Sequence, residues 1–163
     1  MIKKLKKGFT LVELLIYMSL LSGFLIVITE LFASILDVKL ESEATSAVEQ
    51  DGRYILTRLS NDISKSSSIS TPGSLGSTTT SLVMVVSGVT YTYSLNGNNL
   101  QITNNLGTNS LNSSESNVSA VNFQKIGNPG GKETIKINFN IASITSRTGG
   151  PETRMFQTTI GRR

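Results

Sequence analysis

The sequence opens with a long apolar run, continues with apolar residues at helical spacing, and ends in short alternating segments. Residues 9–28 are almost all apolar. The helical spacing that follows is kept by six residues: Leu40, Ala44, Val48, Ile55, Leu59 and Ile63. Acids and glutamines fill most positions between them, and Gly52 weakens the pattern without ending it. The pattern predicts one helix of roughly 55 residues, apolar over 9–30 and amphipathic over 31–66.

The apolar run has the length of a membrane-spanning helix. At about 1.5 Å per residue, residues 9–28 span roughly the 30 Å thickness of the hydrocarbon core of a bilayer. A secretory signal peptide would have a shorter apolar core and a small-x-small cleavage site, and no clear site of that kind follows this run. We therefore expect a single-pass segment in the cytoplasmic membrane, with lipid as its partner. The N-terminus should lie inside, because four lysines precede the run: Lys3, Lys4, Lys6 and Lys7.

Beyond the helix the apolar period changes from helical to alternating. The Ser/Thr/Gly-rich stretch 64–81 and the polar stretch 104–117 are predicted to be loops. Strands are predicted at 82–87, 89–95, 118–126, 134–142 and 154–160. Residues 89–103 read as a hairpin that turns at Asn-Gly. We expect an α+β fold, in which the amphipathic half of the helix packs on a small antiparallel sheet formed by residues 67–163.

Composition excludes several kinds of chemistry. The 163 residues include neither Cys nor His. No disulfide, no Cys/His metal site and no Cys–His catalytic pair can form. No acidic spacing resembles a calcium loop, and no serine lies in a nucleophile motif. We expect a protein that is not an enzyme and that has no metal and no cofactor.

The stretch KGFTLVELLIYMS combines a basic leader, a Gly directly before a Phe, and Thr-Leu-Val-Glu-Leu-Leu running into the apolar segment. It resembles the N-terminal signature of type IV pilins and type II secretion pseudopilins. The resemblance implies that a prepilin peptidase, a separate membrane enzyme, cuts between Gly8 and Phe9 and so removes the leader, residues 1–8. It implies that Phe9 is then N-methylated and that Glu13 serves filament assembly. The implied partners are other pilin or pseudopilin subunits and an inner-membrane assembly platform, and the implied destination is an extracytoplasmic, cell-surface filament.

Glu13 is the one full charge within residues 9–28. A carboxylate in a membrane helix costs roughly 2.5–3.5 kcal/mol even on the mildest scales. Cleavage after Gly8 would create an α-amino cation at Phe9, which could pair with Glu13 of a neighbouring subunit. Such a pair would set the register of a helix bundle more than it would add stability. The alternative is a neutral carboxylic acid, or a carboxylate at the membrane edge that faces the headgroups.

Three features favour a minor pilin or pseudopilin. Many major pilins have a proline at the position of Glu30 and a disulfide near the C-terminus, and this chain has neither. The stretch EQDGRYILTRLSNDISKSSSI resembles the helix exit of the minor pilin W and pseudopilin J groups. The machine could be a type IV pilus, a type II secretion system or a competence system.

Charge leaves two other functions open. The net charge is +4, yet residues 9–63 carry three bases and eight acids, whereas residues 64–163 carry eight bases and three acids. This opposition suggests charge-complementary packing between neighbouring subunits. A DNA-binding pilin of an uptake machine would use a basic footprint: Lys125, Lys132, Lys136, Arg147, Arg154, Arg162 and Arg163. Nucleic acid is the less expected partner, because the aromatic residues of the sheet alternate as core residues do. An unprocessed, single-pass membrane-anchored adhesion protein is the other alternative.

Overall fold

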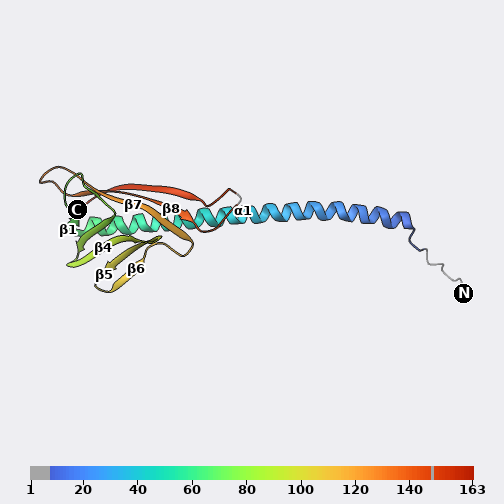
Figure 1. The fold of residues 1–163 in the computed structure, drawn as a ribbon, viewed down its shortest axis with the longest axis horizontal. Coiled ribbons are helices and arrows are strands. Elements are labelled where there is room, and N and C mark those ends of the chain that lie inside the picture. Colours follow the sequence, from blue (N-terminus) through green and yellow to red (C-terminus); the bar gives the residue numbers. More distant parts are fainter. Residues whose placement is uncertain (1–7, 148) are drawn as a thin grey trace. The chain divides into compact units, whose positions relative to one another are not determined.

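The computed structural model describes residues 8–147 and 149–163 of the chain. These residues form two compact units, which divide between Lys39 and Leu40. One helix, α1 (Leu11–Lys65), has 55 residues and contributes to both units (Figure 1). The length predicted from the apolar pattern is therefore confirmed.

In its described residues, the N-terminal unit consists of Gly8, Phe9, Thr10 and the first part of α1. Its large apolar side chains are exposed, by 44% to 77%. Two of its hydroxyl groups bond to the helix backbone: Ser19 Oγ donates to the Ile16 carbonyl and Thr29 Oγ1 to the Leu25 carbonyl, both at 2.8 Å. Helix α1 thus contains a segment that is long and apolar enough to cross a membrane, and these two hydroxyls need no water there.

The C-terminal unit adds two antiparallel sheets to the last part of α1. The strands are β1 (Ser66–Thr71), β2 (Thr78–Thr79), β3 (Ser81–Val86), β4 (Val89–Asn96), β5 (Asn99–Asn104), β6 (Gly107–Ser110), β7 (Ser116–Ile126), β8 (Thr134–Ser143) and β9 (Thr153–Gly161). Sheet A has the order β1-β3-β4-β5-β6 and sheet B the order β2-β7-β8-β9. The predicted α+β class, a long N-terminal helix followed by antiparallel strands, is confirmed. The strands form two sheets where the sequence suggested one.

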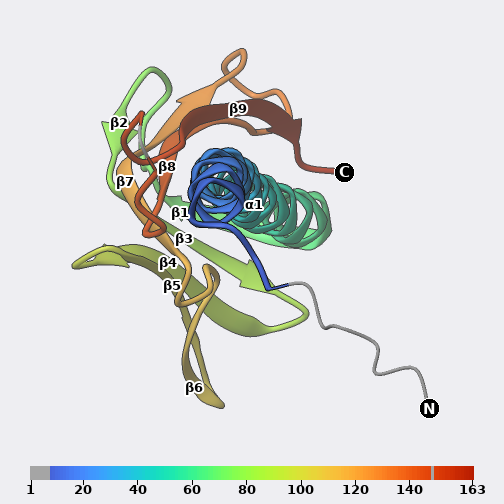
Figure 2. The ribbon, with the colours of Figure 1, turned by 90° about the vertical axis from the view of Figure 1, so that its right-hand side faces the viewer.

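The core of this unit lies between α1 and the two sheets. Figure 2 shows sheets A and B on different sides of the helix. Five residues of the predicted apolar helix face are buried: Ala44, Val48, Ile55, Leu59 and Ile63. All of these except Ala44 belong to one hydrophobic cluster with inward residues of both sheets, among them Tyr93 of sheet A and Phe139 of sheet B. The helical period read from the sequence therefore identified the correct face of α1.

Gly52 allows strand β9 to approach the helix closely. A Cβ atom at Gly52 would lie 2.2 Å from Cζ of Phe156. The Phe156 ring stacks on that of Phe139, with ring centroids 5.6 Å apart and planes 16° apart. An aromatic ring thus occupies the space that any other residue at position 52 would need. Gly52, which weakens the helical pattern in the sequence, is therefore the residue against which β9 packs.

Two segments predicted to be loops contain strands. Within 64–81 lies β1, whose Ser67 and Ser70 hydroxyls donate to carbonyl oxygens of β3 at 3.2 Å. Within 104–117 lies β6, whose four residues are all exposed. Neither strand alternates apolar and polar residues. Backbone pairing with a neighbouring strand, and not burial of a side-chain face, makes them strands.

The predicted hairpin over 89–103 forms from β4 and β5. Asn96 pairs with Asn99, so the turn consists of Gly97 and Asn98, one residue later than the predicted Asn-Gly. Gly97 has a φ of +59°, which a type II′ turn requires at its first central residue and which glycine adopts without a steric penalty.

Candidate processing and assembly site

The peptide bond expected to be cut lies just before the helix. Gly8, Phe9 and Thr10 precede α1 and are all exposed. A Cβ atom at Gly8 would meet nothing within 4 Å, so the backbone is open to close approach by a protease. The four leader lysines, Lys3, Lys4, Lys6 and Lys7, lie outside the described residues.

Glu13 and Thr10 close the first turn of α1 with reciprocal hydrogen bonds. The Thr10 hydroxyl accepts from the Glu13 backbone N–H at 3.2 Å. The Glu13 carboxylate in return accepts, through Oε2, the Thr10 backbone N–H and the Thr10 hydroxyl, both at 3.1 Å. This is a capping box, which satisfies N–H groups that a helix start otherwise leaves unpaired. Glu13 therefore has a structural role inside its own chain.

The sequence interpretation missed this role and considered for Glu13 a partner in another subunit, a neutral carboxylic acid, or a carboxylate at the membrane edge. The signal was visible, because Thr10 and Glu13 have the T-x-x-E spacing of a capping box directly before an apolar run. Both bonds from Thr10 go to Oε2. Within the described part of the chain no hydrogen bond reaches Oε1. One carboxylate can thus cap its own helix and face a second donor.

The ring of Phe9 lies against the helix that follows it. Its centroid is 5.9 Å from that of Tyr17, with the planes at 73°, an edge-to-face arrangement. Phe9 is nevertheless 75% exposed. The residue expected to become the new N-terminus is therefore oriented by one aromatic neighbour and remains accessible.

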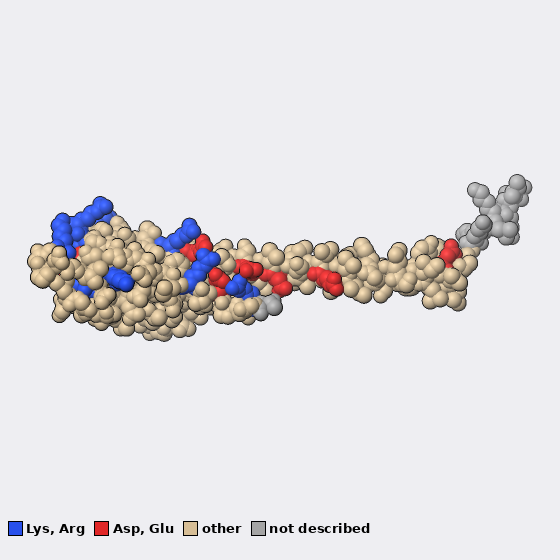
Figure 3. Space-filling view, turned by 90° about the horizontal axis from the view of Figure 1, so that it is seen from above, with Lys and Arg blue, Asp and Glu red and all other residues tan. Residues whose placement is uncertain are grey.

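A second group of charged residues joins the acidic part of α1 to arginines near strand β9. Arg147 bonds to Glu41 at 2.9 Å and to Glu152 at 2.6 Å. Arg154 bonds to Glu152 at 3.0 Å and also pairs with Glu49. Figure 3 shows basic and acidic side chains side by side on this part of the surface. The opposite charges read from the sequence thus form ion pairs within one chain, and their packing between neighbouring subunits stays a prediction.

Asp51 is a buried acid on the helix that the sequence interpretation did not identify. It is 8% exposed. One of its oxygens, Oδ2, accepts the Ser113 N–H at 2.9 Å, the Ser113 hydroxyl at 2.8 Å and the Ser116 hydroxyl at 2.5 Å. These bonds tie the helix to the segment that follows β6 and to the first residue of β7.

Asp62 is a second buried acid of α1, and it ties the helix to sheet A. It is 4% exposed, accepts a hydrogen bond from Arg58 Nε at 2.9 Å, and accepts the hydroxyl of Tyr93 on β4. Burial, together with the hydrogen bond to Asp62 and its negative charge, raises the pKa of Tyr93 far above its usual value. Tyr93 therefore stays a neutral donor to a carboxylate inside the core.

The basic residues considered for a nucleic-acid footprint do not form one free patch. Lys125 is 6% exposed, pairs with Glu133, and donates to the Ile69 carbonyl at 3.4 Å. Arg162 lies 3.6 Å from the second oxygen of Glu133. Arg147 and Arg154 are engaged as described above. Four of the seven footprint residues are therefore in ion pairs within the chain.

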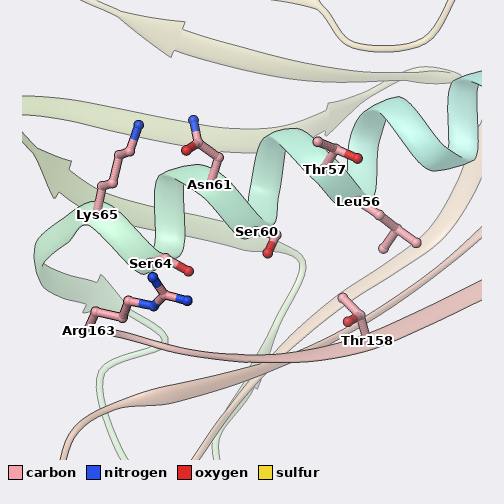
Figure 4. A pocket seen from close by; sticks show the side chains of 8 residues that line it. All are labelled: Leu56, Thr57, Ser60, Asn61, Ser64, Lys65, Thr158 and Arg163. Carbon is pink, nitrogen blue, oxygen red and sulfur yellow. The ribbon is translucent and has the colours of Figure 1, made fainter.

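A polar groove of about 580 Å³ lies between the end of α1 and β9. Its lining consists of Leu56, Thr57, Ser60, Asn61, Ser64, Lys65, Thr158 and Arg163. Figure 4 shows the helix residues on one side and Thr158 and Arg163 on the other. The lining has four hydroxyls, one amide and two cationic side chains.

Comparison of the chain with protein-family models gives a match to its N-terminal segment. No curated protein and no solved structure matches the chain. Residues 3–28 match the family model of the prokaryotic N-terminal methylation motif, so the chain carries the prepilin signal of type IV pilin-like proteins at the start of a long apolar helix.

Proposed function

We propose that this chain is a minor pilin or pseudopilin, a structural subunit of a type IV pilus, type II secretion or competence filament. A prepilin peptidase cuts between Gly8 and Phe9, Phe9 is N-methylated, and the subunit joins the filament through its N-terminal helix. The chain is then divided into a leader (1–8), a transmembrane and assembly helix (9–30), an amphipathic helix (31–66) and an antiparallel β domain (67–163).

One observation carries the proposal. A methylation motif opens a helix whose large apolar side chains are exposed from Leu11 to Val38. An apolar surface of that extent needs a cover, which lipid can supply before assembly and the helices of other subunits can supply afterwards. The C-terminal unit, by contrast, has its own core, formed by the last part of α1 and the two sheets.

The chemistry of the site suggests how cleavage and assembly are linked. The leader lysines hold the N-terminus on the cytoplasmic side, and cleavage removes all four of them. It also creates an α-amino cation at Phe9. In our scheme this cation approaches Oε1 of Glu13 in a neighbouring subunit, while Oε2 keeps its bonds to Thr10. Leaving either partner of such a buried pair alone would cost about 3–5 kcal/mol, which would fix the helix register.

The intact mass of the protein tests the processing step. Protein from cells that have a prepilin peptidase should lack residues 1–8 and carry one added methyl group on Phe9. Protein from cells without the peptidase should keep its full mass. An uncut chain in the presence of an active peptidase would refute the proposal.

Three variants separate the cap from the charge pair. Glu13→Gln keeps an acceptor for the Thr10 N–H but removes the charge, Thr10→Ala removes the hydroxyl of the cap but keeps the charge, and Glu13→Val removes both. Cleavage should persist in all three. The fraction of protein in sheared filaments should fall for both Glu13 variants and be largely kept for Thr10→Ala, whose cap is worth only about 1 kcal/mol. The reverse order, normal Glu13→Gln and defective Thr10→Ala, would rule out the charge pair.

A further inference from the structure

Sheet A contains no charged residue. From Ser66 to Ser114 the sequence has no Asp, Glu, Lys or Arg, and all five strands of sheet A lie in this stretch. Its outward face carries hydroxyl and amide groups, as in the row in which Thr92, Thr103 and Thr108 lie opposite one another. The charged residues of the chain therefore lie on the helix, on sheet B and in the segments that flank them.

Strand β6 is an edge of sheet A without the usual protection against pairing. Edge strands are normally guarded by charges, prolines or bulges. Among the four edge strands of the described sheets, β1 has two register shifts and is followed by Pro72, β2 has two residues, and β9 carries Arg154. Strand β6 has no charge, no proline and no register shift, and its four residues are all exposed. Of these protections against pairing, strand β6 has only its short length.

The ladder shows which backbone groups of β6 are free. The Leu111 N–H donates to the Leu100 carbonyl at 2.8 Å. Bonded and non-bonded pairs alternate along an antiparallel ladder, so Thr108 and Ser110 direct their N–H and C=O groups away from β5. The 2.8 Å contact between the hydroxyls of Thr108 and Thr103 fits the close approach of a non-bonded pair. Two residues of β6 are thus ready to pair with another strand.

We propose that β6 pairs antiparallel with β6 of a second copy of this chain and so joins two copies of sheet A across a two-fold axis. The register that uses both free residues sets Thr108 of one copy opposite Ser110 of the other, and Asn109 opposite Asn109. A second copy fits because neither strand has a charge that would oppose its equivalent. The same register brings Leu106, whose side chain is 87% exposed at the β5–β6 turn, beside the end of β6 in the other copy.

A four-residue edge is too short to hold two free molecules together. The pairing therefore rests on the membrane anchoring in the proposed function, which would keep copies side by side at high effective concentration. It does not depend on cleavage at Gly8. It can therefore be tested on the uncut, membrane-inserted chain.

A single cysteine tests the pairing, because the chain has none of its own. In the proposed register the two Asn109 residues form a non-bonded pair with Cα atoms about 4.5 Å apart, which is within the range for a disulfide. Mild oxidation of membranes from cells without prepilin peptidase should give a homodimer of Asn109→Cys. Thr90→Cys, exposed on β4 of the same sheet, should give several-fold less. Equal dimer from the two variants, or a disulfide to a different protein, would overturn the proposal.

A second substitution tests whether the backbone edge makes the contact. Thr108→Pro removes an N–H that points away from β5, so it should leave the β5–β6 ladder and the protease resistance of the chain unchanged. Added to Asn109→Cys it should abolish the dimer, whereas Thr108→Val, which keeps the N–H, should retain it. A dimer that survives Thr108→Pro would contradict edge pairing.

Alkaline extraction of the same membranes separates this inference from the proposed function. Chain that stays in the pellet without forming the Asn109→Cys dimer would overturn the pairing alone. Chain that leaves the pellet would overturn the anchoring, and with it both proposals.

Discussion

Replacing Gly52 by alanine should destabilise the C-terminal unit, although alanine is the better helix former. On helix propensity alone the change would gain about 1 kcal/mol. The new Cβ would, however, lie 2.2 Å from Cζ of Phe156, a distance at which the ring or the helix must move. Overpacking of this kind costs about 1–3 kcal/mol, and the lost stacking of Phe156 on Phe139 costs roughly 0.5–1.5 kcal/mol. We expect a net loss of about 0.5–3.5 kcal/mol once the propensity gain is subtracted.

Urea unfolding of the full chain in a mild detergent, followed by the circular dichroism of the sheets, would measure this effect. Gln50→Ala, at an exposed position of the same helix, should change the free energy of unfolding by less than about 0.5 kcal/mol. Phe156→Leu removes the atom nearest to Gly52, so Gly52→Ala should destabilise the Phe156→Leu protein much less than the original one. A Gly52→Ala protein that is more stable than the original would refute the close packing of β9 on the helix.

Two further predictions concern the buried acids of α1. Burial and Asp62 raise the pKa of Tyr93, so at high pH the folded protein keeps the Tyr93 proton whereas the unfolded chain loses it. The contribution of Tyr93 to the free energy of unfolding is therefore complete below about pH 10 and falls at higher pH. The urea midpoint of the original protein should therefore fall more steeply above pH 10 than that of Tyr93→Phe, and a Tyr54→Phe control that flattens the profile equally would contradict the assignment. Asp51→Ala leaves the donors of Ser113 and Ser116 without their acceptor and should lower the free energy of unfolding by about 1–3 kcal/mol. Asp51→Asn, which keeps one acceptor oxygen, should lose less, and an unchanged urea midpoint for Asp51→Ala would show that this contact is not stabilising.

The helix and the strongly alternating strands could be predicted from the sequence because their side chains have a buried face. The apolar positions of α1 recur at helical spacing, and those of β8 alternate through Ile135, Ile137, Phe139 and Ile141. Burial of one face therefore produces a periodic apolar pattern in the sequence. Strands β1 and β6 have no such apolar pattern. They form because β3 and β5 offer backbone partners. Backbone pairing between two strands does not require any particular order of residues in either strand, so it cannot be read from the sequence.

The candidate site was predicted in part for the same reason. Gly8, Phe9 and Glu13 lie within residues 3–28, which match the methylation motif, so their local spacing is enough to predict roles for them. The capping box of Thr10 and Glu13 was equally local and could have been identified. The contacts of Asp51 and Asp62 could not, because their partners Ser113 and Tyr93 lie 62 and 31 residues away in the sequence.

The composition of sheet A also determines how its surface responds to the medium. Its outward Ser, Thr, Asn and Gln side chains do not ionise between mildly acid and mildly alkaline pH, and Tyr93 of the same sheet faces inward and is fully buried. Added salt has no charges to screen on this sheet, whereas the ion pairs of Arg147 and Arg154 weaken as ionic strength rises. The C-terminal unit thus has one surface that is insensitive to pH and salt and another that is sensitive to salt. A contact through sheet A would keep its strength when acidity or salinity changes, and a contact through the charged surface beside sheet B would not.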